Sequence, residues 1–203
     1  MKEMTWAPSR VFSLSYEESE PMLRGDKVLL RPVRRSDIDH FLKWFNDPEV
    51  TQYLSNYLPM TEMAEEKYLE ALGGAMANTD AAMVIEAIEA DATKPIGTSG
   101  LHGINNKDHN AGFGIAIGDK EYWGKGLGTE VCRLMVNYGF EQLNVHRIGS
   151  SVISFNERSI RMHLRVGFKE EGRQREAIFK NGKYHDSVMF GLLKEEWKAG
   201  VHR

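Results

Sequence analysis

The 203-residue sequence predicts an α/β (α+β) domain with a mixed, mainly antiparallel central sheet flanked by helices. Three strand-like apolar segments follow one another in the middle of the chain, separated only by turn-forming residues. Segments with helical spacing lie on either side of them. Near the C-terminus, Asn181 and Gly182 join two further strand-like segments, and this dipeptide favours a tight hairpin.

The first elements follow from local signals. An alternating segment at 27–33 predicts a strand, and Pro32 places its end at a sheet edge. Residues 36–47 predict a helix with Ser36 as N-cap, paired with Asp39, and Pro48 ends it. Residues 61–72 predict a second helix, and a loop follows at 73–80.

The remaining elements follow the same reasoning. Asn156 is expected to cap a helix that Gly167 closes, because Asn side chains accept hydrogen bonds from unpaired amides. The expected strands are 81–89, 95–104, 111–117, 147–155, 175–180 and 184–193, and the expected helices are about 127–143 and 156–165. Residues 1–22 read as an irregular N-terminal extension, and 23–203 as one domain.

Composition narrows the class of protein. A net charge of -3 supplies no broad basic surface, so nucleic acid is not an expected partner. No segment has the ~20 apolar residues of a membrane span, and no metal site is expected. The single cysteine, Cys132, excludes an internal disulfide and points to a reducing compartment. We therefore expect a cytoplasmic protein with small partners.

The segment EYWGKGLGTE, 121–130, carries the strongest chemical signal. Glycines that lead into a helix N-terminus present free amides and the positive end of the helix dipole, which together bind phosphate. A Walker loop requires Ser or Thr after Gly-Lys, whereas Gly126 follows Lys125. A dinucleotide site requires an acid on the next strand, which 147–155 lacks. A turn before a helix is the other local interpretation.

The motif resembles the acetyl-CoA loop of the GCN5-related N-acetyltransferases (GNAT), with Trp123 in place of the usual Gln or Arg. YWGKG and NERSIRMHLRVGF resemble the ribosomal-protein N-acetyltransferase (RimJ/RimL-like) branch, as do segments 23–37, 46–50 and 175–190. The resemblance covers about residues 23–195. It implies a sheet split like a V, with acetyl-CoA bound at the split and CoA as product.

The resemblance also implies the cofactor contacts. A strand at 113–117 would pair with the pantetheine arm through its backbone, and the loop would hold the pyrophosphate. The implied cofactor-binding residues are Phe113, Ile115, Ile117, Trp123, Gly124, Lys125, Gly126, Leu127, Gly128, Thr129, Asn156 and Ser159.

Two catalytic candidates lie on the helix after Asn156. His163 stands where the family often has a tyrosine, so it is a candidate proton donor to the departing thiolate. Ser159 is a candidate contact to that thiol by resemblance. Each residue also has an interpretation without a catalytic role. His163 would then be a histidine packed in the core, and Ser159 an ordinary serine in the first turn of the helix.

The general base is harder to find. Family members often carry an acid where this chain has Gly112, which leaves His102, Glu86, Asp119 and Glu121 as candidates by proximity in sequence. Deprotonating a lysine-like amine at pH 7 costs about 4–5 kcal/mol, against about 1 kcal/mol for an α-amine. The missing acid therefore favours an α-amine. A stripe of Glu62, Glu66 and Glu70 instead favours polyamines or basic peptides, unless it is a solvated face.

The sequence thus predicts an acetyl-CoA-dependent N-acetyltransferase that acts on a primary amine, such as a protein N-terminus, an amino acid or a small polyamine. The alternative is a noncatalytic CoA or acyl-CoA sensor with the same fold, suggested by Gly112 and His163. The C-terminal hairpin leaves a strand edge at which a homodimer could form.

Overall fold

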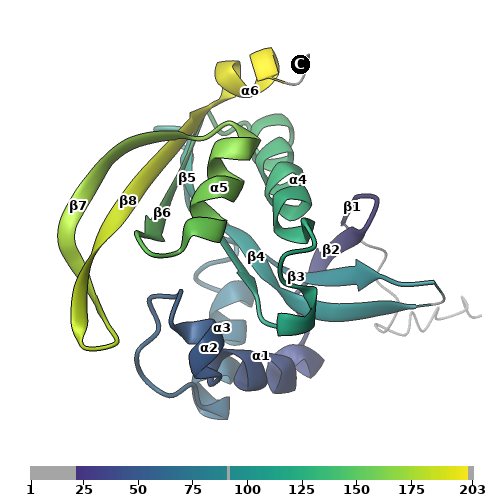
Figure 1. The fold of residues 1–203 in the computed structure, drawn as a ribbon. Coiled ribbons are helices and arrows are strands. Elements are labelled where there is room, and N and C mark those ends of the chain that lie inside the picture. The colour runs from purple at the N-terminus through teal and green to yellow at the C-terminus, as the bar shows by residue number, and fades with distance from the viewer. Residues whose placement is uncertain (1–21, 91, 201–203) are drawn as a thin grey trace, which may run out of the picture.

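Eight strands form one sheet in the order β1-β2-β3-β4-β5-β6-β8-β7 (Figure 1). The computed structural model describes residues 22–90 and 92–200, so most of the predicted N-terminal extension, 1–22, lies outside the described residues. The strands are β1 (Leu23–Arg24), β2 (Val28–Pro32), β3 (Ala81–Ile88), β4 (Thr93–Asn105), β5 (Asn110–Ile117), β6 (Arg147–Ile153), β7 (Lys169–Lys180) and β8 (Lys183–Leu193). The α-helices are α1 (Ile38–Phe45), α2 (Pro48–Thr51), α3 (Glu62–Gly73), α4 (Leu127–Glu141), α5 (Glu157–Val166) and α6 (Lys194–Gly200).

The sheet divides between β5 and β6, its one parallel pair among the described strands. Only residues 110–112 of β5 pair with residues 147–149 of β6, although the strands continue to Ile117 and Ile153. The two strands therefore separate beyond Gly112 and Gly149 and leave backbone groups of both strands without a ladder partner. This separation confirms the predicted mixed, mainly antiparallel sheet with a V-shaped split.

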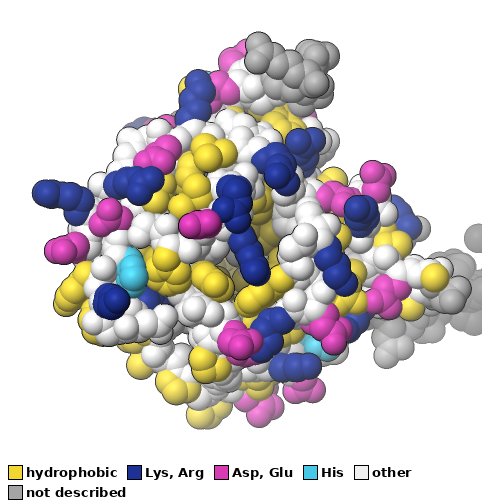
Figure 2. Space-filling model, in the orientation of Figure 1, with side chains coloured by type: hydrophobic (Ala, Val, Ile, Leu, Met, Phe, Trp, Pro, Cys, Tyr) yellow, Lys and Arg dark blue, Asp and Glu magenta, His cyan; other side chains and the backbone are white. Residues whose placement is uncertain are grey.

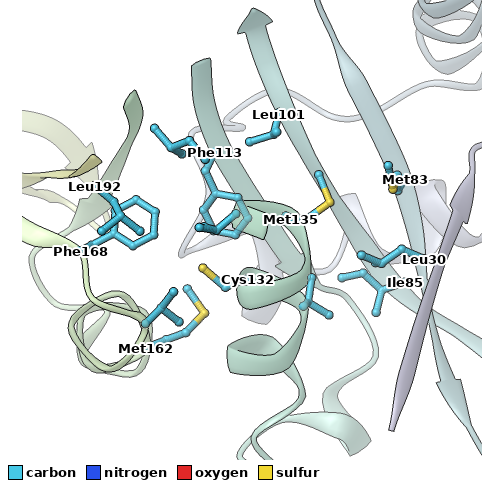
Figure 3. Close-up of a cluster of buried hydrophobic side chains, with 14 of the residues drawn as sticks. Leu30, Met83, Ile85, Leu101, Phe113, Cys132, Met135, Met162, Phe168 and Leu192 are labelled. Carbon is cyan, nitrogen blue, oxygen red and sulfur yellow. The ribbon is translucent and has the colours of Figure 1, made fainter. Parts of the chain in front are cut away.

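Helices α4 and α5 cover one face of the sheet and lie side by side in Figure 1. The α4 helix buries Val131, Cys132 and Met135 against the sheet. Figure 3 shows Phe113, Phe168 and Met162 gathered around the same helix, with Leu30 and Ile85 from the far strands. Burial of these side chains, worth ~1.5–3 kcal/mol for each large one, fixes α4 on the sheet and hence the loop that precedes it.

The opposite face of the sheet carries α1 and a buried ionic cluster. The Arg31 guanidinium donates to both carboxylate oxygens of Asp37, at 2.7 and 2.9 Å, and to Glu86 at 2.6 Å. Phe41 and Trp44 of α1 pack nearby on Val84 of β3. Because α1 begins next to Asp37, the cluster ties the start of this helix to β2 and β3.

Several local predictions need correction. Ser36 is not a helix N-cap: a 3-10 turn at Arg35–Asp37 precedes α1, and Asp37 accepts the Arg34 amide at 2.7 Å. Pro48 begins α2 instead of only ending a helix, because the Asp47 side chain caps it. The β7 strand starts at Lys169, six residues earlier than residue 175, since its polar first half lacks the expected alternation.

Other local predictions are confirmed. The Asn156 side chain accepts the Ser159 amide at the start of α5, and Gly167 ends that helix with φ +112°. The hairpin between β7 and β8 turns at Asn181 and Gly182, both with positive φ.

Candidate functional site

A cavity of about 1540 Å³ occupies the split in the sheet. Residues 112–117 of β5 and 149–153 of β6 line it, together with the glycine loop and α5. Residues from α1, α3 and the segment after α2 line its other side. In Figure 2, Lys and Arg side chains gather around a hollow over α5 and the start of α4, and hydrophobic side chains lie within it.

The glycine loop has a backbone that only glycine adopts readily. Gly124 and Gly126 have φ of +76° and +83°, and a Cβ at either position would project into open space. The amides of residues 125–128 donate no hydrogen bond to any other described residue. The helix α4 begins directly after Gly126, so these amides and the helix dipole form a seat for an anion.

The other predicted loop residues have distinct local roles. The Thr129 amide donates to the Gly126 carbonyl at 3.0 Å, so it is already engaged. The Trp123 indole donates to the Ile117 carbonyl at 2.7 Å, which ties the loop to the end of β5. Lys125 lies with its ammonium 4.9 Å from the centre of the Tyr122 ring. Trp123 therefore connects the loop to β5, in the position where the acetyl-CoA motif that it resembles usually has Gln or Arg.

His163 lies deep below the split, with only 2% of its surface exposed. Its ring stacks on Phe190 and meets Phe113 and Phe168 edge to face. Burial lowers the pKa of His163, and the hydrogen bond to the backbone of Ser159 opposes that shift only in part. The imidazole is therefore neutral at neutral pH.

The hydrogen bonds of His163 assign its single proton. Nδ1 lies 2.8 Å from the Ser159 carbonyl oxygen, which can only accept, so Nδ1 carries the proton. Nε2 then accepts the hydroxyl proton of Ser150 at 2.9 Å. The Ser150 oxygen also lies 3.1 Å from the Phe113 carbonyl, but one hydroxyl proton cannot serve both acceptors.

Ser159 is better placed than His163 to contact a bound thiol. Its side chain lines the cavity, is partly exposed and lies 3.4 Å from His163 Nδ1. Because the Nδ1 proton is directed at the Ser159 carbonyl and hydroxyl, the hydroxyl proton of Ser159 points away from that nitrogen.

Three arginines of α5 line the cavity and were missed by the sequence reasoning. Arg158, Arg161 and Arg165 recur at three- and four-residue spacing, so they share one helical face. The Cζ atom of the Arg158 guanidinium lies 5.7 Å from the centre of the Trp123 ring, beside the glycine loop. The periodicity was a usable signal, but it is equally typical of a solvated helix face.

Comparisons with known proteins agree with this geometry. Residues 27–169 match the family described as "Acetyltransferase (GNAT) domain". The chain belongs to the GNAT acetyltransferase family. It is 33% identical over 181 residues to the Bacillus subtilis "Uncharacterized N-acetyltransferase YoaA", covering 86% of this chain and 97% of that protein. The B. subtilis "Putative ribosomal N-acetyltransferase YdaF" is 38% identical over 103 residues, 51% of this chain and 56% of YdaF.

A solved GNAT structure has the same fold. The Vibrio cholerae spermidine N-acetyltransferase, in complex with CoA and spermine, aligns with a TM-score of 0.78 and 25% identity, over 85% of this chain and 98% of that one. The protein is accordingly an N-acetyltransferase that uses acetyl-CoA, as predicted. The open glycine positions and free amides fit the phosphates of this cofactor, which supplies an activated acetyl thioester when bound.

The four candidates for the general base differ in whether they line the cavity. Glu86 is held by Arg31 and Thr93, while Asp119 and Glu121 face Lys94; none of these acids lines the cavity. His102 does line it. Cys132 lies in the core, and burial raises the pKa of its thiol far above the usual value, so it is not a reactive nucleophile.

The acidic residue that faces inward from α3 is Glu65, outside the predicted stripe. Glu62 and Glu70 are exposed, and Glu66 lies 3.9 Å from Arg35. Glu65 is 3% exposed and lines the cavity, and its Oε2 atom has no hydrogen-bond partner among the described residues. Burial raises the pKa of Glu65.

Within residues 22–90 and 92–200, no group of three or more His, Cys, Asp or Glu side chains could hold a metal ion. No helix in that part of the chain is long and apolar enough to cross a membrane.

Proposed function

We propose that the enzyme acetylates a primary amine of a small cationic acceptor, with a polyamine as the favoured class. The observation that carries this proposal is the charge on either side of one cavity. Exposed arginines and a helix N-terminus line the side of the glycine loop, whereas Glu65 and Asp80 line other parts of the wall. The cavity volume exceeds the ~300–1,000 Å³ of most single-ligand sites, which leaves room for an acyl donor and an acceptor together.

Glu65 is the main support for a cationic acceptor. A buried carboxylate with an unpaired oxygen is costly, and an ammonium ion is the ligand that would satisfy it best. Tyr68 borders the same region, and burial, Asp80 and Glu65 together raise the pKa of its hydroxyl. Burial is the largest cause of this rise, and the two carboxylates add to it, so the negative charge beside Tyr68 also suits a cationic acceptor.

The cofactor side would use the residues that the sequence singled out. The backbone of Phe113, Ile115 and Ile117 faces the split, and amides of Lys125, Gly126, Leu127 and Gly128 would hold the pyrophosphate. The nitrogen of the Asn156 side chain would contact the cofactor arm, since its oxygen caps α5. Ser159 would stabilise the departing thiolate through its hydroxyl, and His163 would orient Ser159 and Ser150.

A second acceptor class has one observation in its favour. The similarity to YdaF fits the ribosomal-protein branch and supports the N-terminal amine of a protein as acceptor. The noncatalytic sensor has no comparable support in the structure or the comparisons.

The test is thiol release from acetyl-CoA with spermidine and spermine, free amino acids, and short peptides with a free α-amine. We expect polyamines to give the highest kcat/KM. A higher kcat/KM with peptides would identify a protein N-terminus, instead of a polyamine, as the acceptor. Binding of CoA with no thiol release above background for any amine would instead identify a sensor.

A further inference from the structure

Gly112 has no side chain, and a side chain from the neighbouring strand occupies the space beside it. His102 of β4 pairs directly with Gly112 of β5. A Cβ atom at Gly112 would overlap the Nε2 atom of His102 and lie 2.7 Å from its Cδ2 and 3.0 Å from its Cε1. The His102 imidazole therefore occupies the volume that a side chain at position 112 would need.

The ring extends along β5 toward the split in the sheet. A Cβ at Gly114 would lie 3.6 Å from the His102 Cε1 and 3.9 Å from its Nδ1. Glycine at both 112 and 114 thus lets the imidazole lie over the strand. Side chains alternate across a strand, so His102 lies on the face opposite Phe113, which packs in the core with α4 and α5.

The position next to His102 across the sheet is open. Gly112 pairs with Gly149 of β6, where a Cβ would approach only the Phe190 carbonyl oxygen, at 3.8 Å. One strand further, at Gly191, the ion pair of Arg147 and Glu171 covers the sheet. An opening one residue wide therefore separates the His102 imidazole from this ion pair.

The His102 ring is free to react. It is exposed, lines the cavity and forms no hydrogen bond with any residue in 22–90 or 92–200. Asp80, Arg147 and Glu171 line the same cavity. An acceptor that enters over Gly149 would pass between the His102 imidazole, which can receive a proton, and the Arg147–Glu171 ion pair.

We propose that His102 is the general base of acetyl transfer and takes the role of the carboxylate that Gly112 lacks. This inference rests on the proposed function. The amine nitrogen bonds to the acetyl carbon, the carbon–sulfur bond breaks, and CoA leaves as the thiol. The ammonium form of the acceptor loses two protons in all. One stays with the thiol, and the other passes through the His102 imidazole to water, which its exposure permits.

The first experiment compares His102→Ala with His146→Ala, a control whose side chain is exposed but does not line the cavity. General bases contribute about 10²–10⁴-fold, so we expect His102→Ala to lower kcat by at least about 100-fold. The Kd of acetyl-CoA, measured by calorimetry, stays unchanged, and free imidazole restores part of the rate. His146→Ala retains wild-type kcat.

The second experiment moves the base back to position 112. Gly112 has no positive φ, so its backbone accepts a glutamate. Gly112→Glu alone collides with the His102 ring and loses activity. The double variant His102→Ala/Gly112→Glu removes the collision and supplies a carboxylate, so it recovers at least about 10-fold in kcat over His102→Ala.

A measurement without turnover completes the test. In CoA-saturated protein labelled with ¹⁵N-histidine, added spermidine shifts the His102 ring resonances and leaves those of His146 in place. Unchanged kcat in His102→Ala, with a wild-type enzyme that turns over, overturns the assignment of His102. Absence of turnover by the wild type with every amine overturns the proposed function instead, and unmoved His102 resonances then overturn this inference as well.

Discussion

At the scale of single residues, the hydrogen bonds of His163 determine which side chains can donate a proton in the cavity. His163 looked like a proton donor in the sequence because it stands in a tyrosine position, but its one proton bonds to the Ser159 carbonyl inside α5. Its other nitrogen accepts from Ser150. Ser159 has a hydroxyl on the cavity side, so we propose that Ser159 contacts the thiol and His163 positions it.

Replacing Ser159 tests that division. Ser159→Ala removes the hydroxyl but keeps the backbone bonds that Asn156 and His163 make to residue 159. We expect kcat to fall by about 10- to 100-fold with little change in the Kd of acetyl-CoA, because the lost contact strengthens only as the thiolate departs. Steady-state kinetics and calorimetry measure the two quantities. An equal loss in binding and kcat would make Ser159 a cofactor-binding residue only.

His163→Phe should lower kcat more than it weakens acetyl-CoA binding, because Ser150 and Ser159 lose their common partner. A phenyl ring suits the aromatic surroundings, so the variant should fold. Thiol-release kinetics and acetyl-CoA titration provide the comparison. A kcat and pH profile equal to those of the wild type would remove His163 from the mechanism.

The same variant also tests the buried neutral state. The pKa of His163 is lower in the folded than in the unfolded protein, so the unfolded chain binds more protons between those two values. Stability contributed by the neutral imidazole is therefore complete above the unfolded value of ~6.5 and declines as pH falls below it. Denaturation between pH 7.5 and 5 should show a steeper loss for the wild type than for His163→Phe. Parallel curves would contradict a depressed pKa.

At the scale of elements, the loop before α4 combines backbone strain with binding. Gly126→Val places a branched side chain at φ +83°, beside the free amides. Left-handed backbone costs ~1–2 kcal/mol for a residue with a Cβ, and the side chain crowds the anion seat, so CoA affinity should fall by at least about 10-fold.

Gly182→Val is the matched control for the loop variant. Gly182 has a similar φ of +76° and open space around it, but it lies in the β7–β8 hairpin and does not line the cavity. It should lose comparable stability without losing CoA affinity. Calorimetric titration with CoA distinguishes the two, and equal affinity losses would show that backbone strain alone explains the effect.

At the scale of the whole molecule, the buried ionic cluster holds α1 against the sheet. Arg31→Met leaves Asp37 and Glu86 buried without their cation, which typically costs ~3–5 kcal/mol of folding free energy. Arg173→Met, which breaks an exposed pair with Glu170, should cost far less. Urea denaturation measures both. A small loss in Arg31→Met would mean that packing of α1 alone maintains this wall of the cavity.

The features of the fold that could be predicted were the helix ends and turns that depend on residues adjacent in the chain. Asn156 and Gly167 bound their helix, and Asn181 and Gly182 turned their hairpin, because capping and positive φ depend on a few adjacent residues. The predicted N-cap at Ser36 was wrong, because the Asp37 side chain accepts the Arg34 amide. The predicted start of β7 was also wrong, because β7 takes its register from pairing with β8. The cytoplasmic location and the homodimer remain predictions.

The sequence by itself determined the family and the cofactor, and it supplies the proposed seat for the phosphates, because that loop is contiguous and its glycines are required by backbone geometry. Only the tertiary structure decided which polar side chains share the cavity. Glu65 turns inward from a helix on which Glu62 and Glu70 are exposed, and His102 reaches Gly112 only through strand pairing. Burial and cross-strand contact join residues that are distant in the chain, so no local pattern encodes them.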